Sequence, residues 1–146
     1  MRHSKSTEKS LEHQLRDAAS SGNLTELKRL VQEGVPVNDR SSFNNTALLY
    51  AAMHGKCGCL RFLIDNGADV NIANNSGYTP LLCAAKIGDY EAVKMLLDAG
   101  AETWHTLKDE DNPLLKSQRT ALSLAERNGH QRVVELLSGV GALQAA

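Results

Sequence analysis

The residues of this chain that could do chemistry most directly are its three cysteines. Cys57 and Cys59, separated by one glycine, and Cys83 supply thiolates, and His54 or His105 could add the imidazole of a zinc site. The single intervening residue departs from the two-residue spacing of the common zinc knuckle. All three cysteines also fall at apolar positions of the repeat pattern described below, where a free thiol is readily buried. We therefore predict free thiols in the core and no metal site.

Other catalytic patterns are missing from the sequence. No Ser/His/Asp or paired-carboxylate arrangement stands out. The glycines are accounted for by repeat positions, which leaves no glycine-rich phosphate loop. A nucleophilic cysteine would need an electropositive, partly exposed setting, which apolar positions do not offer. We therefore expect neither an enzyme nor a bound cofactor.

Composition narrows the function classes further. The chain has 146 residues, 42% of them hydrophobic and only 4% aromatic, and a formal net charge of −1. Nucleic-acid and membrane-surface proteins normally carry a basic stripe, so this balance argues against both. No segment approaches the roughly 20 apolar residues of a membrane helix, and the polar start lacks the apolar core of a signal peptide. With three unpaired cysteines, we expect a protein of the cytoplasm, or of the nucleus.

An internal repeat is the decisive feature of the sequence. Gly34, Gly67 and Gly100 are 33 residues apart, and a second series with the same spacing begins at Gly22. The stretch TALLYAA at 46–52 returns as TPLLCAA at 79–85. The shift from this stretch to its next copy is 41 residues, so the last unit contains an insertion of eight residues.

These residues resemble those of ankyrin-repeat proteins. The resemblance implies an all-α solenoid in which each unit is a hairpin loop followed by two antiparallel helices. Four units are predicted at about 8–38, 39–71, 72–104 and 105–141, between a flexible leader at 1–7 and a tail at 142–146. Thr79 is expected to cap a first helix and Pro80 to occupy its first position, where no N–H is needed. Asn44 stands where the next unit has the hairpin glycine Gly77.

Apolar and glycine columns run through the units in phase. Glycines at 22, 55, 88 and 129 separate the two helices, and those at 34, 67, 100 and 141 are expected to end the second helix in a left-handed conformation. The predicted core columns are Leu15, Leu48, Leu81 and Leu122; Ala18, Ala51, Ala84 and Ala125; Leu27, Leu60, Val93 and Val134; and Leu30, Leu63, Leu96 and Leu137. The family's histidine after Thr-Pro-Leu is replaced by Leu49, Leu82 and Ser123, so its hydrogen bonds are not expected here.

The resemblance also implies where a partner binds, namely the concave surface made by hairpin tips and first helices. Four large apolar residues, Phe43, Met53, Tyr78 and Ile87, fall at outward positions of the two central units. They predict partner anchors within a polar rim, unless Phe43 and Tyr78 only pack across neighbouring hairpins. The other predicted contacts are Asn45, His54, Asn75, Ser76, Lys86, Arg119, Arg127 and Asn128.

The insertion is a second candidate site. Its region, 104–118, forms an acidic loop that ends in Pro113-Leu114-Leu115 and begins with the only tryptophan, Trp104. Trp104 replaces the asparagine found at Asn38 and Asn71. It either packs on Leu114 or Leu115, or anchors a partner, and both roles are common for tryptophan.

The sequence thus favours a non-catalytic protein-interaction module, an adaptor or inhibitor that is monomeric when alone. The alternative is a structural subunit of a larger assembly, docked through the 104–118 loop. A side hypothesis, also implied by the resemblance, is hydroxylation of Asn38 and Asn71, each of which follows a leucine by eight residues.

Overall fold

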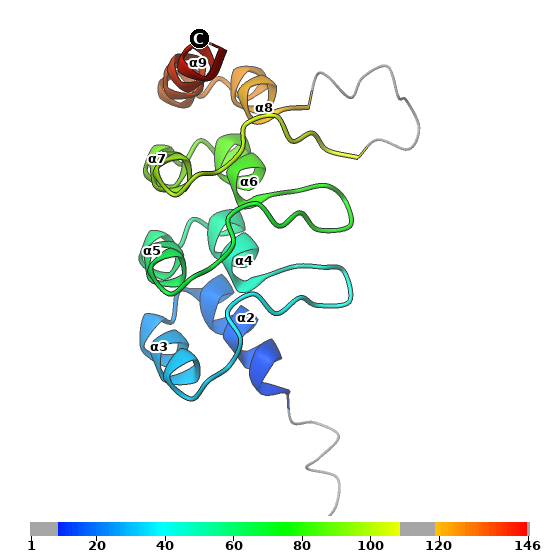
Figure 1. The fold of residues 1–146 in the computed structure, drawn as a ribbon, viewed down its shortest axis with the longest axis vertical. Helices are drawn as coiled ribbons and strands as arrows, with labels where there is room; N and C mark the ends of the chain where they lie inside the picture. Colours follow the sequence, from blue (N-terminus) through cyan, green and yellow to red (C-terminus); the bar gives the residue numbers. More distant parts are fainter. Residues whose placement is uncertain (1–8, 109–118, 146) are drawn as a thin grey trace, which may run out of the picture.

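The structure, a computed structural model, describes residues 9–108 and 119–145. These residues contain helices and loops and no strand. The helices form four successive pairs, which confirms the predicted all-α solenoid (Figure 1). Their bounds are α2 (Leu11–Ser21), α3 (Leu24–Gln32), α4 (Ala47–Met53), α5 (Cys57–Asp65), α6 (Pro80–Ile87), α7 (Tyr90–Asp98), α8 (Ala121–Arg127) and α9 (Gln131–Ala145).

The helices stand in two columns. The first helices of the pairs, α2, α4, α6 and α8, pack on one another in chain order and form the inner column (Figure 1). The second helices, α3, α5, α7 and α9, form the outer column, and the loops project from the opposite side of the inner helices. The core lies between the columns, where the leucines and alanines of each pair meet those of the next. Stability therefore comes from stacking of neighbouring pairs.

Each of the three later inner helices begins with a threonine cap. The hydroxyl oxygens of Thr46, Thr79 and Thr120 accept hydrogen bonds from the N–H groups of Leu49, Leu82 and Ser123 at 3.1, 3.3 and 3.3 Å. Thr46 and Thr79 are 1% exposed, so an uncapped N–H there would be cut off from water. The predicted cap at Thr79 and the proline at the first helical position are both confirmed.

The glycine columns are confirmed at every predicted turn but the last. Gly88, between α6 and α7, has φ = +78°, and a Cβ built on it would lie 2.3 Å from His130 Nδ1. Only glycine fits that turn without moving the imidazole. Asn44, with φ = +63°, takes the left-handed conformation of Gly77, whose position in the repeat it shares. Gly141 departs from the prediction, because α9 continues to Ala145 and does not end there.

The last pair also corrects the predicted core. Leu122 and Val134 are half-buried, whereas their counterparts Leu81 and Val93 are 1% and 0% exposed. No further helix pair covers that side of α8 and α9 within the described residues. Two of the predicted columns of core residues are therefore not fully buried at the end of the stack. Val133, next to Val134 in the chain, is buried instead.

Asparagine side chains bridge consecutive loops. Asn38 donates from Nδ2 to the carbonyl of Gly67 at 3.2 Å and accepts from the N–H of Asp69 at 2.8 Å. Asn71 repeats both bonds one unit later, to Gly100 at 3.3 Å and from Glu102 at 2.9 Å. Both amides thus help to set the loop spacing. Their hydroxylation stays a prediction.

Candidate protein-binding surface

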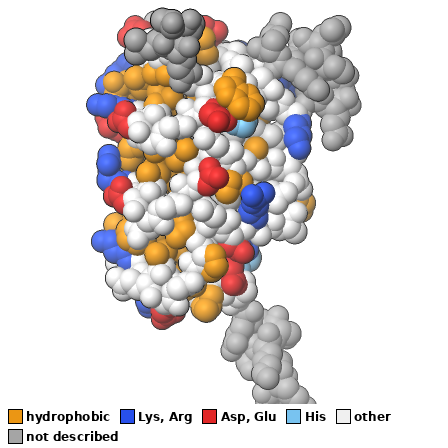
Figure 2. All heavy atoms as spheres, in the orientation of Figure 1, with side chains coloured by type: hydrophobic (Ala, Val, Ile, Leu, Met, Phe, Trp, Pro, Cys, Tyr) orange, Lys and Arg blue, Asp and Glu red, His pale blue; other side chains and the backbone are white. Residues whose placement is uncertain are grey.

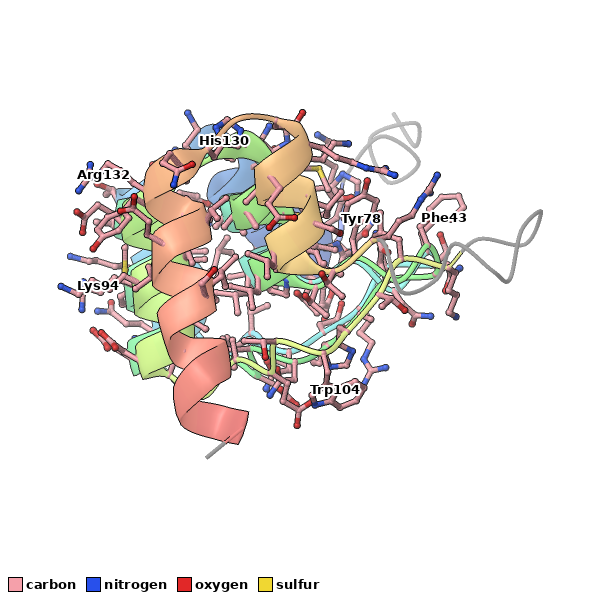
Figure 3. The ribbon with its side chains drawn as sticks, turned by 90° about the horizontal axis from the view of Figure 1, so that it is seen from above. Phe43, Tyr78, Lys94, Trp104, His130 and Arg132 are labelled. Carbon is pink, nitrogen blue, oxygen red and sulfur yellow. The ribbon has the colours of Figure 1, made fainter. Side chains whose placement is uncertain are left out.

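Four predicted anchors lie at the ends of inner helices or on the neighbouring loops. Phe43 is 67% exposed, Ile87 46% and Met53 36%, whereas Tyr78 is half-buried and packs on the core. In the view along the stack, Phe43 and Tyr78 lie on the same side of the loops (Figure 3). We call the surface made by Phe43, Met53, Tyr78, Lys86, Ile87 and Arg127 the inner face.

The structure brings three of the four anchors together. Met53 at the end of α4 and Ile87 at the end of α6 join Tyr78, Cys83 and Lys86 around an open hollow of about 310 Å³, here called the apolar hollow. Lys86 Nζ lies 3.2 Å from the Tyr78 hydroxyl oxygen and 5.4 Å from its ring centroid. The ammonium therefore stands at the rim while its alkyl stem contributes apolar wall.

Phe43 belongs to a neighbouring and more polar hollow. That hollow, of about 300 Å³, is lined by His13, Arg16, Asp17, Ser20, Ser41, Ser42, Phe43 and Tyr50. The predicted group of four anchors is thus divided between two hollows. Phe43 is 67% exposed, which leaves most of its surface open to a partner, and the alternative that it packs across hairpins stays a prediction. The same alternative holds in part for the half-buried Tyr78.

The predicted polar contacts on the loops are engaged within the chain. Asn45 Nδ2 donates to the Tyr50 hydroxyl at 3.3 Å, and Asn45 Oδ1 accepts from Asn74 Nδ2 at 2.9 Å. Asn75 Oδ1 accepts from Asn44 Nδ2 at 2.7 Å. These amides hold adjacent loops in register and so position the anchors. Sequence reasoning missed the role of Asn74, on a loop, and of Tyr50, within α4, although their polar groups next to the hairpins were a signal.

The remaining predicted contacts differ in their surroundings. His54, Ser76 and Arg127 are exposed. The Ser76 carbonyl accepts from the N–H of Lys108 at 3.0 Å. The third loop therefore stays beside the second as far along the chain as Lys108. Asn128 donates from Nδ2 to the carbonyl of Leu124 at 2.8 Å and finishes α8. Arg119 is half-buried.

The second candidate site lies on another side of the molecule. Trp104 is 67% exposed, and its ring stacks on His105 with centroids 4.2 Å apart. Figure 3 places Trp104 on the opposite side of the loops from Phe43 and Tyr78. Leu114 and Leu115 lie outside the described residues, so the predicted packing of Trp104 on them stays a prediction.

The cysteines are free thiols. Cys59 and Cys83 are buried as predicted, and burial raises the pKa of Cys83 to about 12. Cys57 corrects the prediction, since it is half-buried, with Sγ 3.4 Å from Asp89 Oδ2. Burial, with a hydrogen bond to Asp89, raises its pKa to about 11. Within residues 9–108 and 119–145, no three His, Cys, Asp or Glu side chains gather as metal ligands would.

Comparison with known families agrees with this architecture. A family model described as ankyrin repeats, in three copies, matches residues 15–107, which is more than half of the chain. The chain belongs to the ankyrin-repeat family. The match ends before the helix pair α8–α9, which therefore lies beyond the three copies that the family model contains. Ankyrin repeats are generally protein-interaction modules.

A solved ankyrin-repeat structure gives the same result. The crystal structure of the human ASB11 ankyrin repeat domain is similar to this chain, with a TM-score of 0.73 and 31% sequence identity. The similarity covers 86% of this chain and 52% of that one, so the chain spans about half the length of the human domain. No curated protein sequence matched. None of the helices in the described ranges has the length and apolar character needed to cross a bilayer.

Proposed function

We propose that this ankyrin-repeat chain is a non-catalytic interaction module, an adaptor or inhibitor, that binds a protein partner on its inner face. The observation that carries the proposal is the apolar hollow of about 310 Å³ between Met53, Tyr78 and Ile87. Exposed apolar clusters framed by polar groups are typical of protein-binding sites. A large apolar side chain of a partner would remove Met53 and Ile87 from water.

The chemistry of the thiols supports a non-catalytic role. The pKa values of Cys57, Cys59 and Cys83 are all raised, chiefly by burial, so each is a neutral thiol near pH 7. A neutral thiol is a poor nucleophile and a poor metal ligand. Three free thiols also fit a reducing compartment such as the cytoplasm or nucleus, where we place the protein. We further propose that it is monomeric when purified alone.

Affinity capture with matched variants tests the binding face. I87D places a charge in the apolar hollow, and L11D changes a residue with the same exposure, 46%, at the far start of α2. We expect I87D to lose a protein that the parent and L11D both capture, because the carboxylate replaces the apolar contact and must give up water in the interface. Circular dichroism of both variants controls for folding. Equal capture by I87D would contradict the proposal.

A second candidate function rests on Trp104. An indole that is 67% exposed, on the opposite side of the loops, favours a structural subunit docked through the 104–118 region. Tryptophan is enriched among residues that dominate interface energies. W104A is therefore run beside I87D in the capture experiment. A partner lost with W104A and kept with I87D would favour the subunit over the adaptor.

A further inference from the structure

Charged side chains beside the Phe43 end of the inner face form ion pairs with one another. Arg16 Nη1 lies 2.6 Å from Asp39 Oδ2, and Lys9 Nζ lies 2.6 Å from Asp17 Oδ2. His13 also approaches Asp17, at 3.6 Å. Around the hollow that contains Phe43, the carboxylates therefore already have cationic neighbours. The charged side chains that line this hollow thus already have partners of opposite sign.

Two cations in the second half of the inner face lack such neighbours. Lys86 hydrogen-bonds a neutral hydroxyl, that of Tyr78, and Arg127 is exposed at the end of α8. In the described part of the chain, neither of them forms an ion pair. They occupy the same position in successive pairs, 41 residues apart, which is the repeat shift of the last unit. Their side chains therefore continue the inner face beyond the apolar hollow.

Among residues 9–108 and 119–145, the carboxylates that lie closest in sequence to these two cations are engaged or belong to another side of their helix. Asp89 accepts from the N–H of Ala92 at 3.2 Å and lies beside the Cys57 thiol. Glu126 stands 41 residues after the fully buried Ala85 and so belongs to the side of α8 that leads to the open end of the stack. Within the described residues, the positive charge next to the apolar hollow is thus without a carboxylate partner.

Helix dipoles alone do not account for the two cations. Basic residues near a helix C-terminus are stabilising, and Lys86 and Arg127 do lie in the last turns of α6 and α8. The last turns of α2 and α4 contain no basic residue, although these helices belong to the same column. The charge is therefore a property of one half of the inner face and not of every inner helix.

We infer that the partner presents a peptide segment with one large apolar side chain flanked on one side by acidic residues. This inference rests on the proposed function. The apolar side chain fills the hollow between Met53 and Ile87, and the carboxylates meet Lys86 and Arg127 toward the last helix pair. Charge complementarity of this kind selects partners and speeds their association. The outer helices show no such bias, since both signs of charge alternate along their margin in Figure 2.

Selection from a random 12-residue peptide display library tests the inference without a known partner. Recovered peptides are synthesised with a fluorophore, and their affinities are measured by fluorescence polarisation at two salt concentrations. The variants are K86Q/R127Q and the matched control R61Q/K94Q, which removes two exposed cations from the outer helices α5 and α7. I87D reports whether a peptide uses the apolar hollow.

We expect acidic peptides with a large apolar residue, all of which lose binding with I87D. K86Q/R127Q should weaken them by about tenfold at low salt, with a smaller effect at high salt, because exposed charge pairs are screened. R61Q/K94Q should change their affinity less than twofold. Neutral or basic peptides that need Ile87 but not Lys86 and Arg127 would overturn the inference and leave the proposed function standing. A selection that yields no Ile87-dependent peptide would overturn both.

Discussion

The exposed side chains on the inner and outer faces of the same helix pairs differ in the contacts that they make within the chain. On the outer helices, Arg29 pairs with Glu26 and Glu33, and its hydrogen bond to Glu26 lowers the pKa of that carboxyl. Arg132 there lies 4.2 Å from the ring centroid of Tyr90. On the inner face, Phe43 and Ile87 remain 67% and 46% exposed. Several charged side chains of the outer helices thus have partners within the chain, whereas these apolar side chains of the inner face remain open to water.

This difference shows how one repeat can supply both a shared core and a variable binding surface. Leucines and alanines at the shared core positions of both columns fix the stack. The positions that face away from the core are then free to vary, and here the inner helices end in Met53, Lys86, Ile87 and Arg127. The inner positions lie beside the loops and form hollows with loop residues such as Tyr78. We infer that recognition is concentrated there.

The largest effect should come from the turn that joins the two columns at Gly88. We expect G88A to cost about 2–4 kcal/mol of unfolding free energy, from the positive φ and the displaced His130 ring. G67A is the matched control, because Gly67 has φ = +90° and no atom within 4 Å of a Cβ. It should cost only about 1 kcal/mol in urea unfolding. Equal costs would show that the His130 contact does not constrain the turn.

A smaller effect should come from the threonine cap of an inner helix. T79A removes the buried oxygen that accepts from the Leu82 N–H, and should cost about 1–2 kcal/mol. T25A changes an exposed threonine within the outer helix α3 and should alter stability by less than about 0.5 kcal/mol. Thermal melts of both variants measure the contrast. A T79A protein as stable as the parent would show that the cap is dispensable.

The buried Cys83 thiol of the inner helix α6 should make the stability of the protein depend on pH. Burial raises the pKa of Cys83 from near 9 to about 12, so the unfolded chain releases this proton at lower pH than the folded one. The stabilisation of the folded state that comes from keeping the Cys83 thiol neutral is complete below pH 9. It is lost as the pH rises toward 12. At pH 10 the loss should be about 1 kcal/mol.

The pH effect is isolated with C83A, which removes the thiol from the floor of the apolar hollow. Unfolding free energies of the parent and C83A are compared between pH 8 and pH 10. The difference in unfolding free energy between the two proteins should change with pH. The contributions of the other titrating groups are the same in both proteins and cancel. A constant difference would mean that the Cys83 thiol ionises equally well in the folded state.

Much of this fold could be predicted because independent signals share one phase. Thr79, Pro80 and the spaced glycines each require a particular backbone conformation, and all of them agree on where a helix begins or ends. Gly141 failed as a stop signal. Glycine inside a helix costs only about 1 kcal/mol, which does not by itself end the helix. The half-burial of Leu122 depended on whether another pair follows it, which local sequence does not encode.

The candidate site could be predicted only in part. Outward repeat positions correctly indicated exposed apolar residues at Phe43, Met53 and Ile87. Their division into two hollows depends on the lateral spacing of neighbouring loops, which is set by bonds such as Asn44 to Asn75. The engagement of Asn45 with Tyr50 likewise depends on how side chains meet across the loop. Residue type and position in the repeat do not determine such distances.

Methyl NMR of the chain bound to its captured partner tests the central claim most directly. The Met53 and Ile87 methyl groups report on the inner face, and the half-buried Ile64 methyl groups report on the outer helix α5. If the inner face binds, the Met53 and Ile87 resonances should shift on addition of the partner while those of Ile64 stay in place. Shifts at Ile64 with unchanged Met53 and Ile87 resonances would contradict the account.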